Sequence, residues 1–357
     1  MRVLFIGGTG TISAAISRQA QELGWELFLL NRGNRNSVLD TPGTPGKIIE
    51  ITGDIRTESE EAIAARIRAA LAESTGTGSS CFDAAADFIA FTREHVEKDF
   101  HILKGLCRQY IFISSASAYQ KPLSSYLVSE GTPLANPYWE YSRNKIACEE
   151  YLTAQYRENG FPVTIVRPSH TYDERSVPLG VHGSRGSWQI IKRILDEKPV
   201  IIHGDGTSLW TMTHSSDFAR GFTGITGNIR AVGEAVQITS DETLSWNQIY
   251  TAIAAALGKP LHAVHVSSEF LAQCGGPYDF TGSLIGDKAN SVVFDNTKLK
   301  RLVPGFCAQF RFDQGIRETI RHILSHPECQ NEDPEFDEWC DRVIAAREKA
   351  IKEIKNR

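Results

Sequence analysis

Tyr141 and Lys145 are the two residues whose types and spacing point most directly to catalysis. They stand four positions apart, so on a helix their side chains lie on the same face. A phenol with a pKa of about 10 is a poor base at neutral pH, but a neighbouring cation favours the phenolate. Ser114 and Ser115 directly follow an apolar run that predicts a strand. Open α/β sheets bind their ligands at the carboxyl ends of strands, so we expect these serines at that edge.

A glycine-rich loop at the start of the chain predicts a phosphate-binding turn. Residues 7–13 are Gly-Gly-Thr-Gly-Thr-Ile-Ser and follow an apolar strand pattern. Gly7 permits the tight turn, Gly10 lets the backbone approach a pyrophosphate, and the following helix offers free N–H groups. Ser13 stands where a third glycine is usual. An ordinary βα turn has a similar pattern, but the context favours dinucleotide binding. The expected contacts are Gly7, Thr9, Gly10, Thr11 and Ile12.

The residues after the second predicted strand bear on the choice of dinucleotide. An acidic residue there would bind the ribose 2′-hydroxyl of NAD, but the strand ends in Asn31 and Arg32, with Arg35 just beyond. Arginine suits the 2′-phosphate of NADP through charge-assisted hydrogen bonds. The sequence therefore favours NADP over NAD, unless these arginines simply face solvent. Asp54 follows the third predicted strand, where it either accepts a hydrogen bond from the adenine amino group or caps a turn.

The elements that must position these residues alternate along the first half of the chain. Short apolar runs predict strands at Val3–Ile6, Leu27–Leu30, Ile48–Ile51, Phe82–Phe88, Tyr110–Ile113 and Val163–Val166. Helical patterns lie at Ser13–Leu23, Glu58–Ala72, Arg93–Leu106 and Glu140–Gln155. Strands that alternate with helices predict βαβ units, and hence an α/β fold with a Rossmann-type, doubly wound parallel sheet. The strands are almost continuously apolar, as expected when both faces of the sheet are covered.

The second half of the chain predicts a smaller C-terminal α/β lobe that holds the substrate. The expected elements are helices at Trp188–Leu195 and Trp246–Leu257, strands at Val200–His203, Ala235–Ile238 and Leu261–Val266, and a glycine-rich loop over residues 274–286.

In domain terms, we expect an NAD(P)-binding domain over residues 1–168, with a returning segment near residues 208–240. Residues 169–207 and 241–325 would form the substrate lobe. Residues 326–357 would form a charged, solvated helical tail.

Composition argues against several classes of protein. The 357 residues are 41% hydrophobic with a net charge of −5, which argues against disorder and against nucleic acid, whose binding needs surplus Lys and Arg. No apolar run has membrane-spanning length, and the N-terminus lacks a secretory pattern. Seven scattered cysteines favour a reduced, cytoplasmic protein. His322, His326 and Cys329 superficially resemble a ligand set, but Pro327 breaks their spacing and we expect no metal.

Several motifs occur together over about residues 1–325. Besides the glycine loop they are Gly53-Asp54, Ser114-Ser115-Ala116-Ser117-Ala118-Tyr119, Tyr141 with Lys145, Arg167-Pro168, His203 to Gly206, and His214 to Asp217. With these motifs the chain resembles extended short-chain dehydrogenases/reductases of the NAD-dependent epimerase/dehydratase family. It is especially similar to the branch that includes the chloroplast stem-loop-binding proteins.

The resemblance implies a role for each member of a Ser-Tyr-Lys set. Tyr141 would be the general acid/base, Lys145 would lower the tyrosine pKa and hold the nicotinamide ribose, and Ser115 would hydrogen-bond the reacting oxygen. Hydride would pass between the substrate carbon and the nicotinamide. The resemblance also suggests a homodimer formed through two helices. Further cofactor contacts are expected at Ile55, Asp87, Phe88 and Pro168.

The chain also departs from the family pattern. Asp87 lies in Asp-Phe-Ile-Ala where the family usually has His-x-Ala-Ala, and it would bind a ribose hydroxyl or cap a turn. His170 and Trp210 replace an asparagine and an arginine that contact the substrate diphosphate in nucleotide-sugar enzymes, which disfavours a UDP-sugar in the usual pose. Ser117, His170 and Trp210 are candidate substrate contacts. The alternatives are a hydrogen-bonded structural histidine and a tryptophan that packs the lobe.

These observations predict an NAD(P)-dependent sugar or sugar-nucleotide epimerase/dehydratase-type oxidoreductase with a small-molecule, carbohydrate substrate and neither nucleic-acid nor membrane partners. One alternative is an NADPH-dependent carbonyl reductase of a non-nucleotide substrate. Another is a non-catalytic dinucleotide-sensing or RNA-associated protein. The presence of Ser115, Tyr141 and Lys145 favours the enzyme.

Overall fold

The computed structural model describes residues 1–33, 43–74 and 81–356, and its centre is a seven-stranded sheet. Every pairing in this sheet is parallel. In spatial order the strands are β12 (Ala235–Ile238), β7 (Val163–Pro168), β5 (Tyr110–Ile113), β4 (Ala84–Asp87), β1 (Arg2–Ile6), β2 (Glu26–Asn31) and β3 (Lys47–Thr52). The chain runs outward from β1 to β3 and then crosses back to β4, which confirms the predicted doubly wound, Rossmann-type fold.

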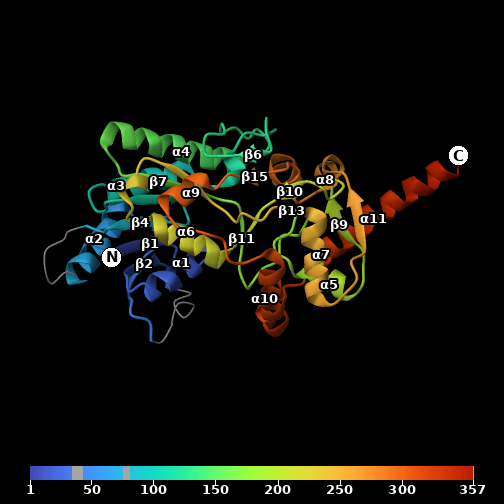
Figure 1. Ribbon diagram of the computed structural model, residues 1–357, viewed down its shortest axis with the longest axis horizontal. Helices are drawn as coiled ribbons and strands as arrows, with labels where there is room; N and C mark the ends of the chain where they lie inside the picture. The colour runs from blue at the N-terminus through green and yellow to red at the C-terminus, as the bar shows by residue number, and fades with distance from the viewer. Residues whose placement is uncertain (34–42, 75–80, 357) are drawn as a thin grey trace.

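Helices cover both faces of this sheet (Figure 1). On one face lie α1 (Thr11–Glu22) and α6 (Ser215–Ile225), and on the other α2 (Glu60–Ser74), α3 (Arg93–Leu103) and α4 (Glu140–Asn159). Side chains alternate along a strand, so Leu4 and Ile6 of β1 join the core beneath α2–α4. Val3 and Phe5 join the core beneath α1 and α6. This explains why β1 has no polar face.

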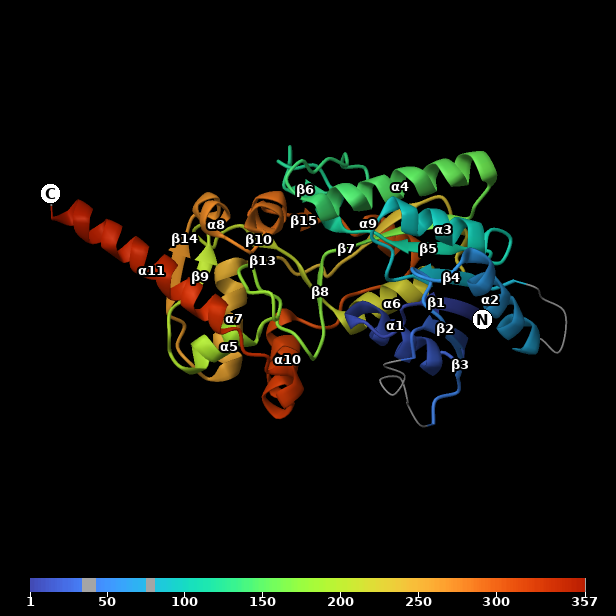
Figure 2. The ribbon, with the colours of Figure 1, turned by 180° about the vertical axis from the view of Figure 1, so that it is seen from behind.

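A smaller lobe lies beyond the carboxyl edge of the sheet (Figures 1 and 2). Its elements are β8 (His170–Tyr172), α5 (Trp188–Leu195), β9 (Val200–His203), β10 (Leu209–Trp210), β11 (Met212–His214), β13 (Leu244–Ser245), α7 (Trp246–Leu257), β14 (Ala263–Val266), α8 (Ser268–Cys274), η4 (Thr281–Lys288), α10 (Phe312–Ser325), η5 (Pro327–Cys329) and α11 (Pro334–Lys355). Shorter elements elsewhere are η2 (Ala116–Ala118), β6 (Leu127–Val128), η3 (Ile229–Ala231), β15 (Val293–Phe294) and α9 (Thr297–Leu302). Four two-stranded ladders join the lobe and its connections: β9 with β14, β8 with β11, β10 with β13, and β6 with β15.

The glycine-rich stretch predicted as a loop is partly helical, and the prediction is wrong from Thr281 onward. Thr281–Lys288 forms the π-helix η4. The Asp279 carboxylate accepts the Gly282 N–H at 2.7 Å and so replaces a missing helical partner. A Cβ at Gly282 would lie 2.2 Å from Cδ1 of Trp139. This glycine therefore serves the close packing of η4 on Trp139, not a turn.

Two segments differ from the predicted lobe boundaries. Residues 297–306, expected in the substrate lobe, return to the sheet domain, where Leu299 and Phe306 join the core beneath α1 and α6. The tail is also not fully solvated, because Phe336 and Cys340 in the first half of α11 are 0% exposed in the lobe core. Apolar residues there recur at helical spacing and form a stripe that must be buried.

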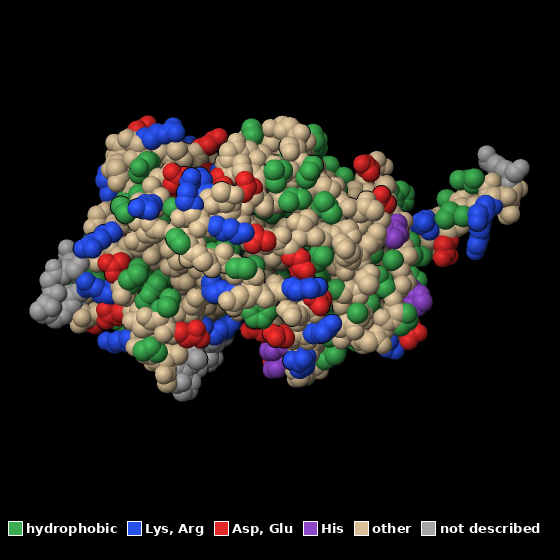
Figure 3. Space-filling view, in the orientation of Figure 1, with side chains coloured by type: hydrophobic (Ala, Val, Ile, Leu, Met, Phe, Trp, Pro, Cys, Tyr) green, Lys and Arg blue, Asp and Glu red, His purple; other side chains and the backbone are tan. Residues whose placement is uncertain are grey.

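The second half of α11 projects from the body of the molecule and carries charges of both signs (Figure 3). On the face shown there, acidic and basic side chains are interspersed over both lobes. No helix in the described part of the chain is long and apolar enough to cross a bilayer.

A buried ion pair fixes α4 to the sheet. Arg167 of β7 donates to both carboxylate oxygens of Glu149 on α4, at 3.0 and 2.6 Å. Ser114, at the end of β5, also hydrogen-bonds Glu149. Both partners of the ion pair are nearly inaccessible, at 6% and 4% side-chain exposure. The pair therefore sets the height of α4 over the carboxyl ends of β5 and β7.

We expect Arg167→Met to destabilise the protein strongly, because it leaves a buried carboxylate without its partner. Removing one member of such a pair typically lowers the free energy of unfolding by about 3–5 kcal/mol. Arg93→Met, which breaks the exposed Arg93–Glu97 pair, is the control and should cost under about 1 kcal/mol. Urea unfolding followed by circular dichroism measures both. Equal losses in the two variants would contradict this assignment.

Candidate active site

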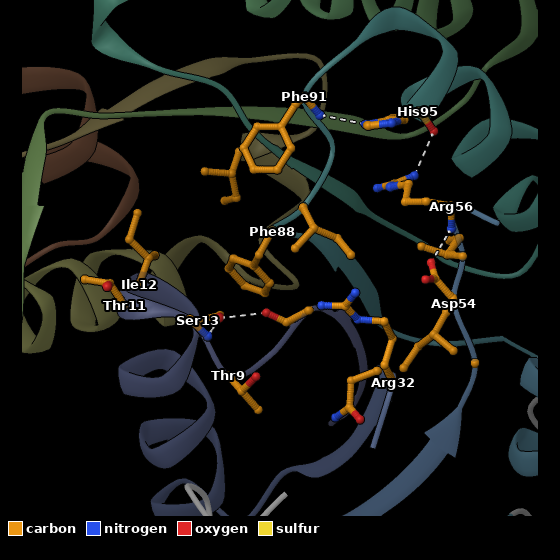
Figure 4. A pocket seen from close by; sticks show the side chains of 18 residues that line it. Thr9, Thr11, Ile12, Ser13, Arg32, Asp54, Arg56, Phe88, Phe91 and His95 are labelled. Carbon is orange, nitrogen blue, oxygen red and sulfur yellow. Dashed lines mark hydrogen bonds between the residues drawn. The ribbon is translucent and has the colours of Figure 1, made fainter. Parts of the chain in front are cut away.

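A cavity of about 850 Å³ opens at the carboxyl ends of β1–β4 (Figure 4). Its walls come from the glycine loop, the residues that follow β2 and β3, and the segment that follows β4. Ten of the predicted cofactor contacts line it: Gly7, Thr9, Gly10, Thr11, Ile12, Asn31, Arg32, Asp54, Ile55 and Phe88. Residues far apart in sequence meet here because parallel strands end at one edge.

The glycine loop has the geometry of a phosphate cradle. Gly7 has a φ of +80°, and a Cβ there would lie 2.5 Å from Cγ2 of Ile89. The Ser13 hydroxyl donates to the Gly7 carbonyl at 2.8 Å and accepts the Gly10 N–H at 2.8 Å. Ser13 thus fastens the loop from the position where a third glycine is usual. Because α1 begins at Thr11, its free N–H groups and positive dipole end face the cavity.

The part of the cavity next to the end of β2 has no acidic residue from that strand among its lining residues. Figure 4 shows the Arg32 side chain reaching across the cavity toward the glycine loop. Asn31 accepts the Gly33 N–H at 2.9 Å through Oδ1, and its Nδ2 is buried without a partner among the described residues. An unpartnered buried donor is costly unless a ligand satisfies it. These residues therefore fit a dinucleotide, whereas Arg35 lies outside the described residues.

Asp54 lines the cavity and also caps a turn. Its Oδ1 accepts the Arg56 N–H at 2.9 Å, which leaves the carboxylate at the cavity wall. The two interpretations that the sequence leaves open for Asp54 are thus compatible.

The structure corrects the expectation for Asp87 as a direct cofactor contact. Its side chain is 0% exposed, its Oδ1 accepts the Ile89 N–H at 2.6 Å, and Oδ2 is paired with Arg56. Because both oxygens are occupied, Asp87 caps the turn after β4. Sequence analysis missed Arg56, which lines the cavity; its place directly after Asp54-Ile55 was the available signal.

A second buried carboxylate completes this cluster. Asp99 of α3 accepts a hydrogen bond from the Tyr110 hydroxyl at 2.6 Å and faces Arg56 at 3.3 Å. Burial, together with the charge of Asp87, raises the pKa of Asp99 well above its usual range. The arrangement therefore holds the Arg56 guanidinium in a fixed position at the cavity wall.

Lys145 lies at the inner end of the cavity. Its ammonium donates to the carbonyls of Ala90 and Ile113 at 2.7 Å each and sits 4.7 Å over the Phe91 ring. Phe91 and Ile113 both line the cavity. Burial lowers the pKa of Lys145 to about 8. The ammonium is therefore placed beside the cavity, between a carbonyl from the segment that follows β4 and the carbonyl at the end of β5.

Tyr141 lies between Lys145 and the smaller lobe. The Lys145 ammonium is 5.7 Å from the centre of its ring. Burial raises the pKa of Tyr141, and hydrogen bonding with Ser115 partly offsets that rise. The Lys145 ammonium donates its hydrogen bonds to the two carbonyls and not to the phenol, so its expected effect on the tyrosine pKa stays a prediction. The phenol keeps its proton at neutral pH.

A chain of hydroxyl groups extends the site from Ser115. Ser117 hydrogen-bonds Ser115 at 2.8 Å and Ser142 of α4 at 2.8 Å. Asn136 donates to the carbonyls of Ser117 and Gly286, at 2.8 and 2.7 Å. The predicted Ser115 and Ser117 are therefore brought together with α4 and with the end of η4.

Of the remaining predicted residues, none lines the dinucleotide cavity. Pro168 is buried at the end of β7. Trp210 is 3% exposed and stacks on Trp246 at 6.3 Å, which is the lobe-packing alternative and leaves no face for a substrate ring. His170 is partly buried opposite Met212 in the β8–β11 ladder. Burial and the charge of Lys288 lower the pKa of His170 to about 3, so it is neutral.

The described residues contain no group of three or more His, Cys, Asp or Glu side chains arranged to hold a metal. The rings of His322 and His326 stack at 3.8 Å.

Comparison with known proteins places this geometry in a family. The model of the NAD dependent epimerase/dehydratase family matches residues 3–238. The chain belongs to this family. It is therefore an extended short-chain dehydrogenase/reductase enzyme, as the resemblance of its motifs implies.

Two curated relatives of this family member are informative. The chain is 26% identical over 307 residues to 2'-dehydrokanamycin reductase of Streptomyces kanamyceticus, covering 86% of this chain and 80% of that protein. It is 24% identical over 267 residues to the chloroplast stem-loop binding protein of 41 kDa b of Arabidopsis thaliana, covering 72% of this chain and 64% of that protein.

Solved structures share the fold. Epimerase Mth375 of Methanothermobacter thermautotrophicus matches with a TM-score of 0.70 and 16% identity, over 92% of this chain and 93% of that one. The dTDP-glucose 4,6-dehydratase of Bacillus anthracis, in complex with NAD, matches with a TM-score of 0.69 and 18% identity, over 92% and 98%.

We expect Gly10→Ala to weaken dinucleotide binding without unfolding the protein. An added Cβ at Gly10 would contact only Ser13 Oγ, at 3.4 Å, so the new methyl group would occupy the cavity and not the core. Gly7→Ala is the contrasting variant, because it places a Cβ against Ile89 at a positive φ and should lower the melting temperature. Fluorescence titration with NADPH and thermal unfolding separate the two effects. Unchanged NADPH affinity in Gly10→Ala would contradict this placement of the pyrophosphate.

Proposed function

We propose that the enzyme is an NAD(P)-dependent epimerase/dehydratase-type oxidoreductase acting on a sugar or sugar nucleotide through Ser115, Tyr141 and Lys145. The observation that supports this most is the placement of the Lys145 ammonium, which joins the inner end of the dinucleotide cavity to the Tyr141 ring. Ser115 is joined to Tyr141 by hydrogen bonding. A substrate oxygen that meets both hydroxyls would place its carbon over the cavity.

The residues divide the chemistry between them. NAD(P), when bound, would supply the acceptor or donor of a hydride. Tyr141 donates its phenolic proton to a carbonyl oxygen in the reductive direction, and it takes that proton back when a hydroxyl is oxidised. Ser115 holds the same oxygen by a hydrogen bond. Lys145 would bind the ribose hydroxyls and stabilise the phenolate that forms when Tyr141 gives up its proton.

Replacing Tyr141 by phenylalanine should abolish turnover and leave dinucleotide binding intact. A positioned proton donor typically contributes about 10²–10⁴-fold to the rate, so kcat should fall by at least about 100-fold. NADPH oxidation with a panel of keto sugars measures the rate, and fluorescence titration measures affinity. Tyr156→Phe, at a half-exposed position on the same helix, is the matched control. Full activity in Tyr141→Phe would exclude this residue as the acid/base.

The charge at the adenosine end supports NADP as the preferred dinucleotide. Arg32 would pair with the 2′-phosphate in the way that an acidic residue would pair with a free 2′-hydroxyl. Denaturing protein purified without added dinucleotide, and identifying what is released, tests the preference directly. Near-stoichiometric retention would favour a recycled dinucleotide, as epimerases and dehydratases need. An empty protein that exchanges NADPH would favour a reductase.

Arg32→Ala should therefore separate the two dinucleotides. We expect NADPH affinity to fall about 10- to 100-fold, the value of one charge-assisted hydrogen bond, and NADH affinity to change by less than about threefold. Arg68→Ala, exposed on α2, is the control. Equal losses for NADPH and NADH would show that Arg32 does not read the 2′-phosphate.

A carbonyl reductase of a non-nucleotide substrate is the second candidate, and two observations favour it. Trp210 is buried in the lobe and His170 is neutral, so neither supplies the charge that a nucleotide diphosphate needs at these positions. Similarity to a protein named as a reductase agrees with this candidate.

A further inference from the structure

Three charged side chains that the mechanism does not use are buried beside the catalytic residues. Lys121 is 3% exposed, Lys288 is 6% exposed and Asp287 is 7% exposed. Lys121 follows η2 and the catalytic serines, and the other two end η4. Burial lowers the pKa of both lysines, and the charge of Asp287 opposes that lowering in each case.

These groups lack the partners that buried charges normally have. Among the described residues, no carboxylate lies within salt-bridge distance of either ammonium. In the described part of the chain, the one hydrogen bond of Lys288 Nζ is a long one, to the Ser283 carbonyl at 3.4 Å, and Asp287 Oδ1 has no hydrogen-bond partner. Burying a charged group without partners costs several kcal/mol. Such an arrangement is explained if a ligand supplies the missing partners.

The cluster is tied to the catalytic residues by short links. Asn136 bridges the carbonyls of Ser117 and Gly286. Because Asp287 is the residue after Gly286, this bridge connects it to the chain of hydroxyl groups that starts at Ser115. The Lys288 ammonium is 5.8 Å from the centre of the Trp139 ring, which lies 5.0 Å from the Tyr141 ring. A substrate held by Tyr141 would therefore lie within reach of the cluster.

The backbone at this point is held firmly. The Lys288 carbonyl accepts hydrogen bonds from Trp246 Nε1 at 3.1 Å, from His203 Nε2 at 3.2 Å and from Ser208 Oγ at 3.4 Å. π-Helical segments are rare and occur frequently at functional sites. The end of η4 is thus fixed to the lobe core, while the Lys288 ammonium approaches the Trp139 ring and the Asp287 carboxylate acts on Tyr141 by its charge.

The sum of charges selects the ligand. Two ammonium groups face one carboxylate, His170 is neutral, and the neighbouring Asp279 is exposed and occupied in capping η4. The surplus is positive. We propose that Lys121 and Lys288 bind a carboxylate or phosphate group of the substrate, while Asp287 accepts a hydrogen bond from a neighbouring hydroxyl. The enzyme would then act on an acidic carbohydrate, which rests on the proposed function and narrows it.

The test uses four probes that share one sugar frame: D-glucuronate, D-glucose 6-phosphate, D-glucose and D-glucosamine. The full chain is first saturated with NADPH, and each probe is titrated by calorimetry. We expect at least one acidic probe to bind about tenfold or more tightly than glucose, and glucosamine to bind more weakly than glucose. Glucuronate against glucose 6-phosphate distinguishes a carboxylate from a phosphate ligand.

Lys121→Met and Lys288→Met should each reduce the preference for the acidic probe to within about threefold of glucose. Lys259→Met, which removes an exposed partner of Glu197, is the matched control and should leave the preference unchanged. Retained NADPH affinity shows that a variant is folded. If a variant does not fold, the comparison of the four probes with the wild-type protein still tests the proposal.

Equal binding of neutral and acidic probes, or no binding of any probe to the NADPH-loaded protein, would overturn this inference and leave the oxidoreductase assignment standing. Failure of the wild-type protein to bind either NADPH or NADH would instead overturn the proposed function. The two failures are therefore distinguishable.

Discussion

The attachment of α4 to the carboxyl edge of the sheet is the constraint on which the site depends. Helix α4 carries Tyr141 and Lys145 and is attached to the sheet at two points. Lys145 donates to the carbonyls of Ala90 and Ile113. One turn further on, Glu149 accepts hydrogen bonds from Arg167 and Ser114. Both attachments are buried, where hydrogen bonds to charged groups are strong and their loss is costly. A helix held this way cannot slide without breaking the hydrogen bonds of a buried charge, so the Tyr141 ring keeps its place beside Lys145.

The same edge of the sheet also explains how one cavity receives residues from so many segments. Because the strands are parallel, the glycine loop, the Asn31-Arg32 pair and the Asp54 turn all lie at the carboxyl edge of the sheet. Between them the Asp87–Arg56–Asp99 cluster holds a guanidinium at the wall. Its charge is balanced from inside the protein, whereas the Arg32 side chain reaches into the cavity (Figure 4). The two arginines therefore differ in function: one shapes the wall and the other is available to a ligand.

Under the proposed function, the smaller lobe would supply polar groups to the substrate through η4. Helix η4 packs Gly282 and Gly286 against Trp139, which brings Asp287 and Lys288 near the proposed catalytic residues. The lobe core fixes the end of η4 through the Lys288 carbonyl. Specificity for the substrate would thus depend on packing between the lobe and the segment that precedes α4, and not on the dinucleotide domain.

The sequence by itself determined the sheet domain, because that domain is built from local signals. Val3–Ile6 and Tyr110–Ile113 are apolar on both faces, and the glycine loop directly follows a strand, so periodicity and turn chemistry were sufficient. The helical spacing of Tyr141 and Lys145 likewise follows from the chain alone. Motif resemblance then added the roles of Ser115, Tyr141 and Lys145, which remain proposals.

Only the tertiary structure decided the features that depend on contacts between distant segments. Asp87 caps a turn because Arg56 occupies its other oxygen, and Trp210 packs the lobe because Trp246 lies against it. The pKa of Tyr141 rises because burial outweighs its hydrogen bond with Ser115. The glycine-rich segment of η4 resembles a loop in sequence but is helical, and its glycines leave room for the Trp139 side chain to pack against the helix. Residue type and spacing fix which groups a chain offers, but burial and partners, set by long-range packing, fix their charge and their use.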